Sequence, residues 1–438
     1  MEIITNVQGP FLTYAAMNVF CHAMNAGLYR SSDVEEEVGI LEQVIPQWSQ
    51  RRFLSPYLYG LHLGRIGDRL LDIAASCGMY DVVDYLLSHG QGVNDCNDEG
   101  YTALHYAARW GQEDVAKLLL RIGANRSATR TNNNMPIAEA AYGGHLQLVK
   151  LLLPRDPDRF RHMSLSKSQA DAGYLGKALQ RAAGAGREEV VRLLLQFGAD
   201  VLSGTGINAL PVASRRGHIR IVRLLLDVGA DMNVTTALYG SALQEACSEG
   251  RDNVVQALLQ RGADINLHSP VLGTPLHAAS RGGYPAIVRR LIAGGVEVNT
   301  LCFTPMTGHQ ISALHDAVHY GDVATVQVLL ESGADINAGC GTCGTPLLSV
   351  INRLNPPEKQ AEIFELLVEC EADSSIPDIN GNTPLHRAAS QCSPVLLRLQ
   401  NESDLFSIRD LFGRIPLHYT VRALEANLDG AWMVLKHT

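Results

Sequence analysis

The strongest constraint on this chain is a sequence that returns at a nearly fixed interval. GYTALHYAARWGQEDVAKLLLRIGA at residues 100–124 is echoed by GTPLHAASRGGYPAIVRRLIAGG and by GNTPLHRAAS. The apolar residue before the His position, Leu104 in the first copy, has ten equivalents, and five of the ten intervals are 33 residues. The equivalents are Leu71, Ile137, Leu179, Leu210, Leu243, Leu276, Leu314, Leu347, Leu385 and Leu417. A catalytic signature occurs once, so this repetition predicts an array of about eleven structural units.

Each unit is expected to contain two short helices. In the unit of Leu104, the hydroxyl of Thr102 can accept a hydrogen bond from an unpaired N–H at the start of the first helix. Gly111 ends that helix, where a positive φ is expected. Val115 and Leu118 then lie on one face of a second helix. The same order of residues recurs along most of the chain, so one supersecondary unit is repeated.

From about residue 67 to about residue 426 the sequence strongly resembles the ankyrin repeat family. The resemblance implies a β-turn and two antiparallel helices per unit, in an all-α solenoid whose units bury their apolar faces against one another. It divides the chain into a helical N-terminal cap (1–62), a repeat array (63–426) and a C-terminal tail (427–438). Longer intervals predict irregular junctions near residues 154–175, 302–310 and 353–362.

Residues 1–62 do not follow the repeat. Ser32 and Glu35 have the spacing of a capping box, and a helical cap over the first unit is one interpretation. The order of Tyr14, Phe20 and His22 also resembles the helices that link the NTPase region to the repeats in fungal NACHT-type receptors. GYLGKA at 173–178 lacks the Ser or Thr of a nucleotide-binding loop. A relationship to those receptors would therefore concern their sensor half alone.

Composition favours an intracellular protein. The longest apolar runs fall short of a membrane span, and the first residues lack the basic charge of a secretory signal. Nine cysteines without framework spacing suit a reducing compartment, so the cytoplasm or the nucleus is expected. The formal net charge of −9 argues against nucleic acid as a partner.

No residue pattern in the sequence supports catalysis, and no cofactor or metal is expected. The repeated histidines share one position, where the ankyrin family uses the ring to bond neighbouring backbone. His315 and His319 lie four residues apart, but two imidazoles alone make a poor zinc site. Cys340 and Cys343 have the spacing of a redox pair without its βαβ context. An active site assembled from distant residues stays an open alternative.

The expected binding surface is the concave side of the array. The two residues between the alanine pair and the glycine are the least constrained structurally, and they are rich in Arg and aromatic residues, which dominate interface hot spots. Two tyrosines near the finger tips extend that surface. The predicted partner-binding residues are Tyr101, Arg109, Trp110, Tyr142, Arg215, Arg216, Tyr239, Glu249, Arg281, His319, Tyr320 and Arg353. Trp110 and Tyr320 are expected to form the pocket.

Three functions remain open at this stage. The first is an adaptor that binds a protein or peptide segment, acidic or phosphorylated, along the concave groove. The second is the sensor half of an immune-type receptor. The third is an enzyme or small-molecule binder with a pocket at the irregular junction near 154–175.

Overall fold

The structure is a computed structural model that describes ten stretches of the chain. These are residues 70–129, 135–153, 169–201, 209–236, 239–304, 309–320, 322–340, 344–351, 357–391 and 407–420. The predicted N-terminal cap, the C-terminal tail and Arg353 lie outside the described residues. The chain forms two compact units, Met1–Ala209 and Leu210–Thr438.

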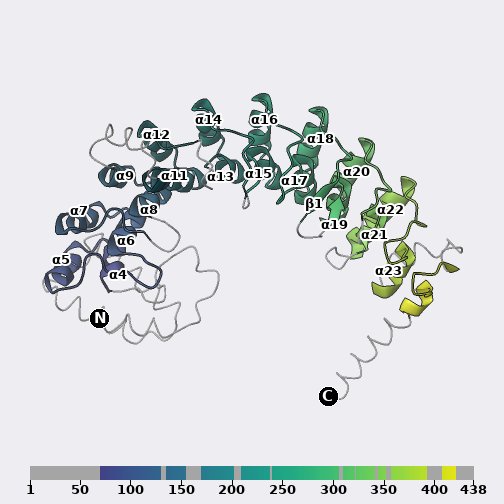
Figure 1. Cartoon of the computed structure of the whole chain (residues 1–438), viewed down its shortest axis with the longest axis horizontal. Coiled ribbons are helices and arrows are strands. Elements are labelled where there is room, and N and C mark those ends of the chain that lie inside the picture. The colour runs from purple at the N-terminus through teal and green to yellow at the C-terminus, as the bar shows by residue number, and fades with distance from the viewer. Residues whose placement is uncertain are drawn as a thin grey trace, which may run out of the picture. The chain divides into compact units, whose positions relative to one another are not determined.

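The described residues of the first unit form four helix pairs. The first helices of the pairs pack against one another in sequence order, and the second helices form a neighbouring row (Figure 1). The first helices are α4 (Leu70–Cys77), α6 (Ala103–Trp110), α8 (Pro136–Gly143) and α11 (Gln169–Gly184). The second helices are α5 (Tyr80–Ser88), α7 (Glu113–Ile122), α9 (Leu146–Leu152) and α12 (Glu188–Gln196).

The second unit continues the same alternation. Its first helices are α13 (Ala209–Arg216), α15 (Ala242–Ser248), α17 (Pro275–Gly282), α19 (Ala313–Tyr320), α21 (Pro346–Val350) and α23 (Pro384–Gln391). Its second helices are α14 (Ile219–Asp227), α16 (Asp252–Gln260), α18 (Pro285–Ala293), α20 (Val323–Glu331) and α22 (Pro357–Glu369). A hairpin of β1 (Cys302–Thr304) and β2 (His309–Ile311) precedes α19 and pairs Cys302 with Ile311.

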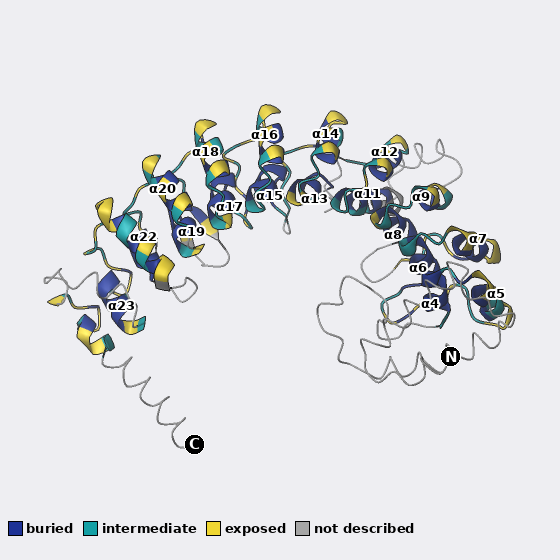
Figure 2. Ribbon diagram, turned by 180° about the vertical axis from the view of Figure 1, so that it is seen from behind, coloured by how far each residue is buried: buried dark blue, intermediate teal, exposed yellow. Residues whose placement is uncertain are grey.

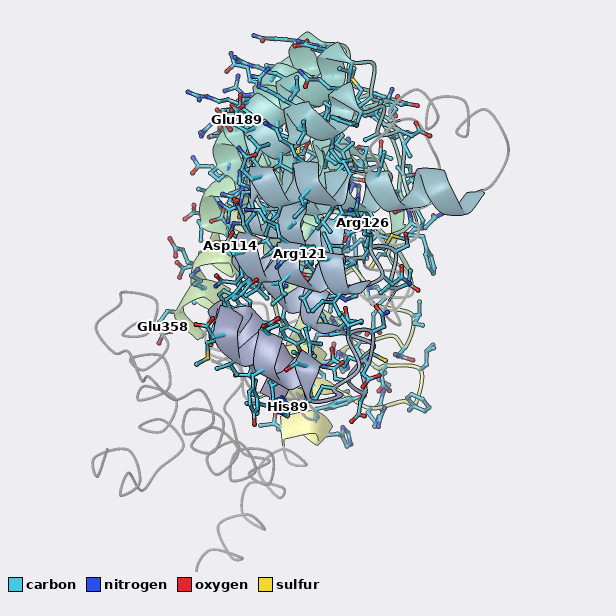
Figure 3. All side chains as sticks on the ribbon, turned by 90° about the vertical axis from the view of Figure 1, so that its left-hand side faces the viewer. His89, Asp114, Arg121, Arg126, Glu189 and Glu358 are labelled. Atoms are coloured by element: carbon cyan, nitrogen blue, oxygen red, sulfur yellow. The ribbon has the colours of Figure 1, made fainter. Side chains whose placement is uncertain are left out.

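The repeated apolar position forms the core. Leu104 is fully buried, and its equivalents from Leu71 to Leu385 are at most 3% exposed. Leu417, in the last copy, is 62% exposed. Buried residues gather on the first helices, whereas exposed residues cover one side of the second helices (Figure 2). Charged side chains such as Asp114 and Arg121 project from α7 (Figure 3).

Three of the repeated histidines, His277, His315 and His386, bond one repeat to the next. In His315, Nδ1 lies 2.8 Å from the Ser312 hydroxyl and accepts from the Ser312 N–H, while Nε2 lies 3.1 Å from the Gly344 carbonyl oxygen. His277 makes the matching contact with the Ile311 carbonyl oxygen at 3.0 Å. These bonds confirm the expected structural role of the repeated imidazoles.

A row of asparagines adds a second connection between repeats. The Oδ1 of Asn266 accepts from the Glu297 N–H at 3.1 Å, and that of Asn299 accepts from the Asp335 N–H at 2.8 Å. These side chains satisfy backbone donors that exposed turns would otherwise leave to water. Repeats in each unit are therefore joined by hydrogen bonds as well as by apolar contact.

Candidate partner-binding surface

Three positions of the first helix decide what this surface can bind. Counted from the repeated apolar residue, they are the second, fifth and sixth residues, which in α6 are Tyr106, Arg109 and Trp110. The predicted binding residues on the first helices occupy the fifth and sixth positions. The second position was not considered from the sequence, yet it determines what the fifth position does.

The fifth-position arginines pair with acidic residues at the second position of the next first helix. Arg109 Nη1 lies 2.7 Å from Glu139 Oε2, whose side chain is fully buried. Arg281 binds both carboxylate oxygens of Asp316, at 3.2 and 3.3 Å. Arg215 is the third fifth-position arginine, and its Nε lies 3.9 Å from Oε2 of Glu245, the second-position residue of the next first helix. The fifth-position arginines thus contact the next repeat, and their role as partner-binding residues stays a prediction.

Burial governs the charge of these carboxyl groups. Burial raises the pKa of Asp316 to about 6, although Arg281 acts in the opposite direction. Burial would also raise the pKa of Glu139, but Arg181 and Arg109 outweigh it and hold that pKa below its usual value. Glu139 therefore stays ionised, and its charge is shared between two arginines.

Arg215 has a more exposed partner as well. Its Nε lies 3.0 Å from Glu249 Oε1, and the arginine side chain is about half exposed. Two of the predicted binding residues thus neutralise each other. Exposed ion pairs of this kind are weak, so either side chain can be drawn away by a stronger partner.

Two tyrosines remain open to solvent. Tyr142, at the fifth position of α8, is 40% exposed, and the guanidinium groups of Arg109 and Arg181 lie 5.0 and 4.5 Å from the centre of its ring. Tyr320, at the sixth position of α19, is 41% exposed and packs edge-on against the half-buried His319. Both rings are carried on helices and are partly exposed to solvent.

The remaining sixth-position residues differ in exposure. Arg216 is exposed at the end of α13. Trp110 is half-buried, and its Nε1 has no hydrogen-bond partner among the residues that the structure describes. The sequence predicts Trp110 and Tyr320 as pocket residues; Trp110 belongs to the first unit and Tyr320 to the second.

The finger tyrosines behave differently from the prediction. Tyr101 is 3% exposed, because its N–H donates to Asn97 Oδ1 and its ring packs against His105 and Tyr106. The prediction that it extends the surface is therefore wrong. Tyr239 is half-buried, and its N–H donates to the Thr236 hydroxyl at 3.0 Å.

The sequence analysis missed exposed apolar residues in the fingers, which are the segments that precede the first helices. Phe303 on β1 is 51% exposed, and Leu411 and Phe412 are more than 70% exposed. Apolar residues in otherwise polar turns, as in DLFG at 410–413, are a signal that could have identified them.

Within the described stretches, no group of three His, Cys, Asp or Glu side chains is placed to hold a metal ion. Burial raises the pKa of the Cys247 thiol, which keeps it protonated and unreactive. One cavity of about 230 Å³ is lined by polar side chains of the 378–382 turn, α23 and Tyr419. The described helices include none with the length and apolar character needed to cross a bilayer.

Comparison with known proteins agrees with this geometry. The family described as "Ankyrin repeats (3 copies)" matches residues 62–129, 179–269 and 243–340, together more than half of the chain. The human BCL-6 corepressor-like protein 1 is 37% identical over 93 residues, 21% of this chain and 5% of that protein. The rice probable E3 ubiquitin-protein ligase XBOS32 is 31% identical over 159 residues, 31% of this chain and 32% of that protein. The Aspergillus oryzae ankyrin repeat domain-containing protein oryK is 31% identical over 101 residues, 23% of this chain and 16% of that protein.

The chain spans less than a third of the length of each of these three relatives. The solved structure of the human ASB11 ankyrin repeat domain aligns with a TM-score of 0.37 and 23% identity, over 61% of this chain and 99% of that domain.

The structure consists of helix pairs, and each pair packs against the next along the chain. This arrangement defines an all-α repeat protein, a class of protein–protein interaction module. The chain belongs to the ankyrin repeat family.

Proposed function

We propose that this protein is a non-catalytic adaptor that recognises a segment of a protein partner on the first-helix surface of its repeats. The observation that carries the proposal is the contrast between the fifth-position arginines, which are engaged between repeats, and Tyr142 and Tyr320, which are open. Tyrosine contributes large contact area at low entropic cost and is enriched at interface hot spots.

Rigidity supports this proposal. The side-chain bonds of His277, His315 and Asn299 hold successive repeats in one arrangement. A surface that is already ordered loses little conformational freedom when a partner binds, so more of the contact energy appears as affinity. The partner is proposed to be an acidic or phosphorylated segment with an aromatic or aliphatic anchor, and Arg216 is the exposed sixth-position cation available to it.

A location in the cytoplasm or nucleus fits this role. The described cysteines carry free thiols, among them the exposed Cys96 and Cys370. Exposed thiols persist where the surroundings are reducing. The net charge of −9 makes a protein a better candidate than nucleic acid for the partner.

Affinity purification from native lysate tests the proposal with single variants. Tyr142→Ala and Tyr320→Ala are compared with Tyr80→Ala, whose ring is 37% exposed on the second helix α5. We expect a specific protein to be retained by wild type and by the Tyr80 variant and lost with at least one of the other two. Equal retention by all four folded baits would refute recognition through the first helices.

The charge component is tested separately. Arg216→Glu should weaken retention of the same partner if its segment is acidic, because attraction becomes repulsion. Arg223→Glu, on the exposed side of α14, is the matched control. Unchanged retention by the Arg216 variant would remove the acidic partner while leaving the adaptor in place.

A further inference from the structure

The first unit contains an excess of positive charge around Tyr142. Six residues form this Tyr142 cluster: Arg109, Glu139, Tyr142, Arg181 and Arg187, which are joined by direct contacts, and Lys177, which lies one turn before Arg181 on α11 and feels its charge. They come from α6, α8, α11 and the residue before α12. Four are cations and one is a carboxylate. Within the described part of the chain, Glu139 is the one carboxylate paired with any of these cations.

One oxygen atom of Glu139 serves two arginines. Its Oε2 accepts from Arg109 Nη1 at 2.7 Å and from Arg181 Nη2 at 3.0 Å. The Nε of Arg181 is buried and has no hydrogen-bond partner among the described residues. Both guanidinium groups also contact the ring of Tyr142, so part of their charge faces an aromatic surface instead of an anion. Among the described residues, one carboxylate thus faces two guanidinium groups, and the charge of one of them is not balanced by an ion pair.

The other two cations have neutral partners. Lys177 is half-buried, and its Nζ donates to Gln180 Oε1 at 3.1 Å. Burial and the nearby Arg181 lower the pKa of Lys177. The Nε of Arg187 donates to the Tyr142 carbonyl oxygen at 3.1 Å. An anion brought to this place would be attracted by several like charges that repel one another in its absence.

We propose that the Tyr142 cluster binds a carboxylate side chain within an acidic segment of a protein partner, with the exposed ring of Tyr142 packing beside it. This inference rests on the proposed function and names the chemistry that one surface of the adaptor selects. Guanidinium groups recognise carboxylates by charge-assisted hydrogen bonds, and Lys177 contributes a charge without a role in joining the repeats.

The test measures binding of a fluorescein-labelled hexaglutamate peptide to the full chain by fluorescence anisotropy at low salt. Lys177→Gln removes one charge of the cluster and leaves the Glu139 ion pairs intact. Its matched control is Lys150→Gln, which removes the same charge from the exposed side of α9 in the same unit. We expect the Lys177 variant to bind about three- to fivefold more weakly, as for one partly exposed charge contact, and the control to bind like wild type.

The variant Glu139→Gln should change hexaglutamate binding in the opposite direction to Lys177→Gln. Loss of the carboxylate should strengthen hexaglutamate binding, an effect that a purely structural role for Glu139 does not produce. The Lys177 comparison stands by itself if this variant fails to fold. Absence of hexaglutamate binding, or equal weakening by the Lys177 and Lys150 variants, would overturn the proposal.

A peptide of the same length with two phosphoserines distinguishes the source of the anion. Binding of that peptide alone, dependent on Lys177, would assign a phosphate site and refute the carboxylate. Different results would refute the proposed adaptor function and the proposed anion site. A Tyr142-dependent partner without hexaglutamate binding removes only the anion site, whereas hexaglutamate binding without any Tyr-dependent partner removes only the adaptor.

Discussion

Replacing His315 by glutamine should remove a defined part of the acid sensitivity of the second unit. The backbone N–H of Ser312 can only donate, so His315 Nδ1 must accept, and the Gly344 carbonyl oxygen can only accept, so Nε2 must carry the proton. The neutral imidazole satisfies both bonds, and protonation of Nδ1 would break one. Burial lowers the pKa of His315 to about 4.

The sign and size of the effect follow from that pKa. Between about pH 6.5 and pH 4 the unfolded chain binds one more proton at this ring than the folded chain does, so the free energy of unfolding falls as the pH falls. The slope is about 1.4 kcal/mol per pH unit, and the total loss is about 3 kcal/mol by pH 4. The contribution is fully present above pH 6.5. Asp316 titrates with the opposite sign, because its raised pKa makes stability fall as the pH rises through about 6.

Glutamine already occupies this position elsewhere in the array. In α15, Gln244 Oε1 accepts from the Ser241 N–H at 2.7 Å and its Nε2 donates to the Leu267 carbonyl oxygen at 2.8 Å. His315→Gln can therefore keep both kinds of bond without a titrating group. Asp316 is present in both proteins, so its titration cancels in their difference.

The assay is urea unfolding from pH 7.5 to pH 4.5, followed by hydrogen exchange in the segments from α17 to α20. This local readout is needed because repeat arrays do not have to unfold in one step. We expect the difference in unfolding free energy between wild type and variant to shift by about 2 to 3 kcal/mol in favour of the variant as the pH falls. A difference that stays constant with pH would refute the assigned hydrogen bonds.

Three further substitutions test the structure by urea unfolding. Glu139→Ala should lower the unfolding free energy by about 3 kcal/mol, because it leaves two partly buried arginines without their carboxylate; a loss below 1 kcal/mol would contradict this. Gly111→Ala should cost more than Gly123→Ala. Both have positive φ, but only at Gly111 would a Cβ meet the His145 ring, at 2.6 Å. Tyr101→Ala should cost about 3 kcal/mol as a buried aromatic, whereas a stable variant with weakened partner binding would restore it to the surface.

The sequence predicted the unit and its core because both depend on residues close together in the chain. The apolar residue at Leu104, the neighbouring histidine and the closing glycine recur with the period, so the spacing along the chain is enough to identify them. The cap, the tail and Arg353 lie outside the described residues, so their assignments stay predictions. Local spacing is thus a good guide to the repeating part of the fold.

The surface was harder to predict because its contacts cross between repeats. Arg281 was predicted to bind a partner because it lies between the alanine pair and the glycine, and its ion-pair partner Asp316 lies 35 residues away. Counting from each fifth-position arginine to the second position of the next repeat would have revealed the pairs. Tyr101 was predicted to lie at the surface because it is near a finger tip. Its N–H instead donates to Asn97 Oδ1, and its ring packs against His105 and Tyr106.

The central claim is that the fifth-position arginines join repeats while the exposed aromatic residues face the partner. A double-mutant cycle on Arg281 and Asp316, with Arg281→Met and Asp316→Asn, measures the first half directly as a coupling in unfolding free energy. The account predicts a coupling of about 1 to 3 kcal/mol, and less than about 1 kcal/mol for the exposed pair Arg261–Asp227. If the effects of the two substitutions on the unfolding free energy were additive, the claim would be contradicted. The fifth-position arginines would then be candidates for partner binding again.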